Sequence, residues 1–99
     1  MPVAFDEVEQ KITDAARQVE ADPGASPVLV AVVLEFQAKL TKAQKRATDG
    51  VAGHDAVTEL EQAGDSAKAA AQADTGLSEA ALASVLAAHL AICKLKAGA

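Results

Sequence analysis

The chain has 99 residues, the size of one domain, with 9 basic and 14 acidic side chains and a net charge of −5. This acidic balance and the absence of Trp and Tyr argue against a nucleic-acid partner, because such proteins present basic surfaces and aromatic stacking platforms. Hydrophobic residues make up 51% of the sequence, but half of them are the 25 alanines. We therefore expect a single helical domain over residues 1–99 with a small core.

The sequence contains one cysteine, Cys93, which cannot form an internal disulfide. Small secreted domains with weak cores are usually held by several disulfides, so we expect a reducing, cytoplasmic location. The acidic N-terminal residues do not resemble a signal peptide. The longest apolar runs, 27–34 and 80–93, are shorter than the roughly 18 to 20 residues that cross a bilayer. We expect no membrane contact.

Apolar residues recur at steps of three and four between glycine- and proline-containing segments, which is the spacing of one helix face. The pattern predicts four helices, over residues 5–20, 27–49, 55–74 and 78–96. Ser26 and Ser78 are placed to cap the second and fourth helices, because a serine oxygen accepts hydrogen bonds from first-turn N–H groups. Similar lengths and short connections favour an all-α, antiparallel four-helix bundle. We identify no internal repeat at this level.

Two features leave alternatives open. Four of the seven residues in 28–34 are valines, which favours a strand. The helical stripe continues to Ala47, however, and no second strand-like run is available for pairing, so we favour a helix. The sequence Gly64-Asp65-Ser66 contains both a helix-stop and a helix-cap signal, so a break near Gly64 is the alternative to one continuous third helix.

The inner faces of the last two predicted helices differ in side-chain size. Small residues on the third helix would allow a neighbouring helix to approach closely, whereas the fourth helix carries larger groups. The predicted inner residues are Val57, Leu60, Gly64, Ala67 and Ala71 on the third, and Leu82, Val85, Leu86, His89, Leu90, Ile92 and Cys93 on the fourth.

The second predicted helix has apolar residues away from its main stripe. Val30 and Leu34 lie one turn apart, at least 100° from the stripe centre, and Val28 and Thr41 extend this outer face. A wide apolar arc is typical of the most buried helix of a bundle. It is also typical of a docking surface for a second copy or another protein. The second interpretation makes Val28, Val30, Leu34 and Thr41 candidate partner-binding residues.

His89 and Cys93 are four residues apart, so both project from one side of the fourth helix. A closed zinc site needs four ligands, and the only other histidine is His54, so we predict no metal site. Both side chains also fit a core, with Cys93 as a small hydrophobe and His89 making one hydrogen bond. The alternative function is therefore a small-ligand or metal-binding bundle with a pocket lined by Phe36, Leu40, Val85, His89 and Cys93.

No catalytic constellation emerges. The sequence has no phosphate-binding glycine loop, metalloprotease motif or dinucleotide fingerprint, and its paired carboxylates map to solvent-facing positions. The basic cluster at 39–46 is explained by compensation of the helix dipole, with an acidic partner as the alternative. We expect a non-enzymatic interaction module without a cofactor. It would act as a homo-oligomer, most simply a homodimer, or as an accessory or adaptor subunit.

Overall fold

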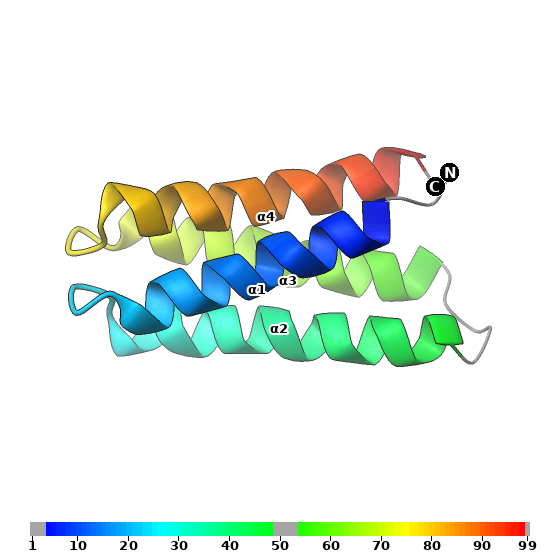
Figure 1. Cartoon of the computed structure of the whole chain (residues 1–99), viewed down its shortest axis with the longest axis horizontal. Helices are drawn as coiled ribbons and strands as arrows, with labels where there is room; N and C mark the ends of the chain where they lie inside the picture. The colour runs from blue at the N-terminus through cyan, green and yellow to red at the C-terminus, as the bar shows by residue number, and fades with distance from the viewer. Residues whose placement is uncertain (1–3, 49–53, 99) are drawn as a thin grey trace.

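The computed structural model describes residues 4–48 and 54–98, with side-chain environments for 6–45 and 57–95. It contains four helices: α1 (Ala4–Ala21), α2 (Pro27–Thr48), α3 (His54–Ala73) and α4 (Glu79–Gly98). Consecutive helices pack side by side, and α4 returns against α1 to close the bundle (Figure 1). The bundle is elongated, measuring 40 × 20 × 18 Å. The predicted all-α four-helix bundle is confirmed.

The structure resolves both alternatives left open by the sequence. Residues 28–34 lie inside α2, and the described residues contain no strand. The strand interpretation is therefore wrong. Residue 64 lies within α3, which runs uninterrupted from His54 to Ala73. The break considered near Gly64 is also wrong.

The bundle consists of two helical hairpins. Hairpin 1 comprises α1 and α2, hairpin 2 comprises α3 and α4, and both connecting loops lie at the same end (Figure 1). Each loop reads Asp-x-Gly-x-Ser, at residues 22–26 and 74–78, an offset of 52 residues. At this offset 14 of the 47 residue pairs are identical. They are 4/56, 7/59, 9/61, 10/62, 15/67, 21/73, 22/74, 24/76, 26/78, 31/83, 33/85, 34/86, 42/94 and 47/99. The chain is a tandem repeat of one hairpin, and the expectation of no repeat is wrong.

The repeat also governs the core. Four pairs of buried residues of α2 and α4 occupy equivalent positions in the two hairpins: Leu29 and Ala81, Val33 and Val85, Phe36 and Ala88, Leu40 and Ile92. The buried Ala43 and Ala91 have partly buried equivalents, Leu95 and Lys39. These buried positions correct the predicted inner face of α4. Leu82, Leu86, His89 and Cys93 are only partly buried, and Leu90 is 54% exposed. Ala81 and Ala88 of α4 are buried where α2 carries the larger Leu29 and Phe36.

Gly64 makes room for the aromatic ring of Phe36. A Cβ atom placed on Gly64 would lie 3.2 Å from Phe36 Cζ and 3.6 Å from His89 Cδ2. A glycine inside a helix costs about 1 kcal/mol relative to alanine. At residue 64 this loss accompanies a close contact with the ring of Phe36 from α2.

Candidate functional site

Among the residues with described side chains, two of the three exposed large hydrophobic residues lie on the first turns of α2. Residues 27–34 carry no charged side chain, yet Val28 is 68% exposed and Leu34 is 44% exposed. Ala31, between them in the sequence, is exposed as well. Isolated exposed hydrophobic residues are common on protein surfaces, so the distinguishing feature is that Val28 and Leu34 lie within two turns of one helix, whereas the third exposed large hydrophobic residue, Leu90, lies on α4. We call Val28, Ala31 and Leu34 the α2 outer face.

The other two predicted contact residues differ from this pair. Val30 is partly buried and packs against the hydrophobic core, which accounts for its apolar character. Thr41 is exposed, but its hydroxyl donates to the Gln37 carbonyl at 3.2 Å, within α2. It lies two turns beyond Leu34, next to the exposed Lys42. The α2 outer face is therefore narrower than the predicted surface.

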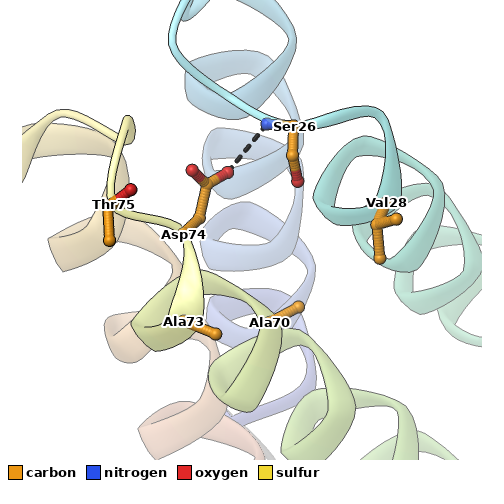
Figure 2. A pocket seen from close by; sticks show the side chains of 6 residues that line it. All are labelled: Ser26, Val28, Ala70, Ala73, Asp74 and Thr75. Atoms are coloured by element: carbon orange, nitrogen blue, oxygen red, sulfur yellow. Dashed lines mark hydrogen bonds between the residues drawn. The ribbon is translucent and has the colours of Figure 1, made fainter.

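A shallow hollow of about 270 Å³ adjoins this face. It is lined by Ser26 and Val28 at the start of α2 and by Ala70, Ala73, Asp74 and Thr75 at the end of α3 (Figure 2). Pockets for small molecules are usually deeper and span about 300 to 1,000 Å³. The hollow is better suited to receive part of a partner's side chain than to enclose a ligand.

The first hairpin loop is tied to the second by a carboxylate. The backbone N–H of Ser78 donates to Asp22 Oδ2 at 2.8 Å, and the N–H of Gly24 donates to Asp22 Oδ1 at 2.8 Å. One oxygen thus shapes its own loop and the other holds the start of α4. The Ser78 N–H bond is the main reason that the pKa of Asp22 lies below its ordinary value.

The second loop repeats this arrangement in the opposite direction. The N–H of Ser26 donates to Asp74 Oδ2 at 2.7 Å (Figure 2), and the N–H of Gly76 donates to Asp74 Oδ1 at 3.0 Å. The Ser26 bond lowers the pKa of Asp74, while desolvation opposes the shift. We call the reciprocal set the clasp; its members are Asp22, Gly24, Ser26, Asp74, Gly76 and Ser78.

The two glycines of the clasp bring the loops into backbone contact. A Cβ atom on Gly24 would lie 1.8 Å from the carbonyl oxygen of Gly76, and one on Gly76 would lie 2.6 Å from that of Gly24. The serines cap their helices as predicted: Ser26 Oγ accepts from the N–H of Leu29 at 3.2 Å, and Ser78 Oγ accepts from the N–H of Ala81 at 3.2 Å. The capping role was predicted, but the contact between loops was not.

A second hollow of about 230 Å³ lies beside the clasp, lined by Gln18, Ala21, Asp22, Pro23 and Ser78. Each of these residues is the repeat equivalent of one lining the first hollow. Ala70 and Thr75 in the first correspond to Gln18 and Pro23 in the second, and Val28 has no counterpart in the lining of the second. The first hollow is therefore the more apolar of an equivalent pair.

The alternative pocket is largely filled by its own side chains. Phe36, Leu40 and Val85 belong to the hydrophobic core, and each is at most 3% exposed. His89 Nε2 lies 2.6 Å from Asp65 Oδ1, and the Cys93 sulfur lies 3.8 Å from His89 Nε2. His89 thus has two hydrogen-bond partners, the Asp65 carboxylate and the Cys93 thiol, where the sequence led us to expect one.

Metal ligands do not gather around His89 and Cys93. Among the side chains that the structure describes, no group of three or more His, Cys, Asp and Glu residues could hold a metal ion. The side chain of His54, the other histidine considered from the sequence, lies outside the described residues.

Two members of the basic cluster meet an acidic partner within the chain. Lys39 Nζ and Lys42 Nζ each lie 3.6 Å from Glu59 Oε1 on α3, and Lys39 Nζ also lies 3.8 Å from Glu35 Oε1. These partly exposed pairs join α2 to α3, and such pairs contribute little stability individually. The side chain of Arg46 lies outside the described residues.

Comparisons with known proteins returned no relative: no protein-family model, curated protein or solved structure matches the chain. Over the described residues, none of the helices is long and apolar enough to span a membrane.

Proposed function

We propose that this protein is a non-enzymatic interaction module that contacts a protein partner through the α2 outer face. The partner is a second copy of the chain, giving a homodimer, or a larger assembly in which the chain is an accessory or adaptor subunit. The lone Cys93 is consistent with work in a reducing compartment, the cytoplasm.

The observation that carries this proposal is the exposure of Val28 and Leu34 on a charge-free helical segment. Covering apolar surface yields about 25 cal/mol per Å² removed from water, so burial of these two side chains by a partner would stabilise the assembly. The adjacent hollow beside Val28 offers a partner side chain a place to insert. Interface cores are depleted of charge in the same way.

The test is a double substitution of the two exposed residues, Val28→Asp with Leu34→Asp. Size-exclusion chromatography with light scattering should show an assembly heavier than the 10.0 kDa chain for the native protein, and the 10.0 kDa monomer for the variant. Circular dichroism should show unchanged helix content. Val30 is unsuitable for this test because it packs against the core.

Leu90→Asp provides the matched control. Leu90 is 54% exposed on α4, so it receives the same chemical change outside the α2 outer face. This variant should assemble like the native chain. An assembly that survives the double substitution would contradict the proposed surface, and a native chain that stays at 10.0 kDa at every concentration would contradict self-association.

A further inference from the structure

The clasp alone does not determine which hairpin pairs with which. Both loops carry the same Asp-x-Gly-x-Ser sequence, and each aspartate accepts the N–H of the other loop's serine. Two copies of hairpin 1, or two copies of hairpin 2, carry all the groups needed for the same reciprocal bonds. Any preference for pairing hairpin 1 with hairpin 2 must come from another part of the interface.

One buried layer breaks the symmetry of the repeat. Phe36 of α2 packs on Gly64 of α3, with its Cζ atom 3.2 Å from the position of a Cβ on that glycine. The equivalent positions are Ala88 on α4 and Ile12 on α1, and both residues are fully buried. Since α1 is adjacent to α4 as α2 is to α3, the equivalence of the hairpins places Ile12 opposite Ala88, again a large residue with a small one but with the sizes reversed.

Pairing like with like would lose this match. Two copies of hairpin 1 would set Phe36 against Ile12 twice, which overfills the layer. Two copies of hairpin 2 would set Ala88 against Gly64 twice, which leaves cavities. Overpacking and cavities in a close-packed core are both destabilising.

We infer that the surface between the hairpins is a heterotypic recognition surface, on which hairpin 1 accepts hairpin 2 and rejects another hairpin 1. Its partner is supplied within the chain or by a second copy, which offers the same hairpin 2. When substitutions weaken the pairing of the hairpins within each chain, two copies associate by exchanging hairpins, a route to dimers that reuses the contacts of the monomer. This surface is distinct from the α2 outer face.

The experiment uses two full-length variants with complementary defects. Gly64→Leu fills the space that the Phe36 ring occupies and overpacks the layer, whereas Phe36→Ala removes the ring and leaves a cavity. Neither chain alone therefore packs this layer well. An exchanged dimer of the two chains redistributes these defects. The substituted hairpin 2 of the first chain meets the substituted hairpin 1 of the second, and the two native hairpins meet each other. Both layers are then filled.

The variants are unfolded together, refolded as an equimolar mixture and analysed by native mass spectrometry and thermal unfolding. The expected product is a mixed dimer of two chains whose unfolding midpoint exceeds that of either variant alone. The control is one chain carrying both substitutions, which should regain a higher midpoint as a monomer. Adding Val28→Asp and Leu34→Asp to both chains separates this surface from the α2 outer face, because the mixed dimer should persist.

Three results would overturn the inference. Absence of a mixed dimer, although the doubly substituted chain regains its unfolding midpoint, would refute exchange with a second copy. A doubly substituted chain that is no more stable than the single variants would refute the size match between residues 36 and 64. A dimer of the Phe36→Ala chain alone, as stable as the mixed dimer, would refute selective pairing.

Discussion

Replacing Gly24 by alanine should open the clasp. The new Cβ atom would lie 1.8 Å from the carbonyl oxygen of Gly76, whereas ordinary van der Waals contact begins at 3.4 Å, so the loops must separate by about 1.6 Å. The bonds from the Ser78 and Ser26 N–H groups, now 2.8 and 2.7 Å long, would then be lost. The equivalent substitution in the other loop, Gly76→Ala, requires the loops to separate by only about 0.8 Å, from 2.6 to 3.4 Å.

The expected energies follow from this difference. Overpacking costs about 1 to 3 kcal/mol, and replacing glycine by alanine returns about 0.4 to 1 kcal/mol by restricting the unfolded chain. Taking the upper end for Gly24→Ala gives a net loss of about 2 kcal/mol, and the middle of the range for Gly76→Ala gives about 1 kcal/mol. For a chain of this size, a loss of about 2 kcal/mol lowers the melting temperature by about 8 to 16 °C.

Thermal and urea unfolding followed by circular dichroism measure both variants. Thr75→Ala is the matched control. Thr75 is exposed next to Gly76 in the second loop, so its truncation should change the free energy of unfolding by less than about 0.5 kcal/mol. Equal losses for the two glycine variants, or a Gly24→Ala chain as stable as the native protein, would refute the backbone contact between the loops.

Two further predictions concern the core and the carboxylates of the clasp. Phe36→Ala should lower the free energy of unfolding in urea by about 3 to 5 kcal/mol because its ring is fully buried, whereas Leu90→Ala at an exposed site should change it by less than about 0.5 kcal/mol; similar losses would contradict the assignment of the core. The folded-state pKa values of Asp22 and Asp74 lie below the ordinary 3.8, so their contribution to stability is complete above pH 3.8 and disappears as the pH falls through the folded-state values. Thermal midpoints measured from neutral to acid pH should therefore fall more steeply below pH 3.8 for the native chain than for Asp22→Asn with Asp74→Asn, and parallel curves would be the opposite result.

The helices were predictable because their determinants are local. Apolar residues at steps of three and four and serine caps at 26 and 78 gave bounds within two residues of the structure. The role of Gly64 within its helix could not be predicted in this way, because it depends on a ring from another helix. The centre of α4 was misplaced for a similar reason: hydrophobicity ranked Leu90 above Ala88, while packing selected the smaller residue.

The clasp and the repeat were missed although the sequence contains a signal for both. The bonds of the clasp join residues 48 and 56 positions apart, so local propensity carries no information about them. The identical Asp-x-Gly-x-Ser segments could have revealed the repeat. The outer-face prediction was right in part of its placement, with Val28 and Leu34 exposed, but Val30 packs against the core because the buried arc of α2 is wide.

The contact between the two hairpin loops is tested most directly by amide hydrogen exchange in the native chain. The N–H groups of Ser26 and Ser78, each bonded to an aspartate of the opposite loop, should be protected although they precede their helices. Asp22→Ala should expose the Ser78 amide and Asp74→Ala the Ser26 amide. Exchange of both amides in the native chain at the rate of an unstructured peptide would contradict the paired hairpins on which this account rests.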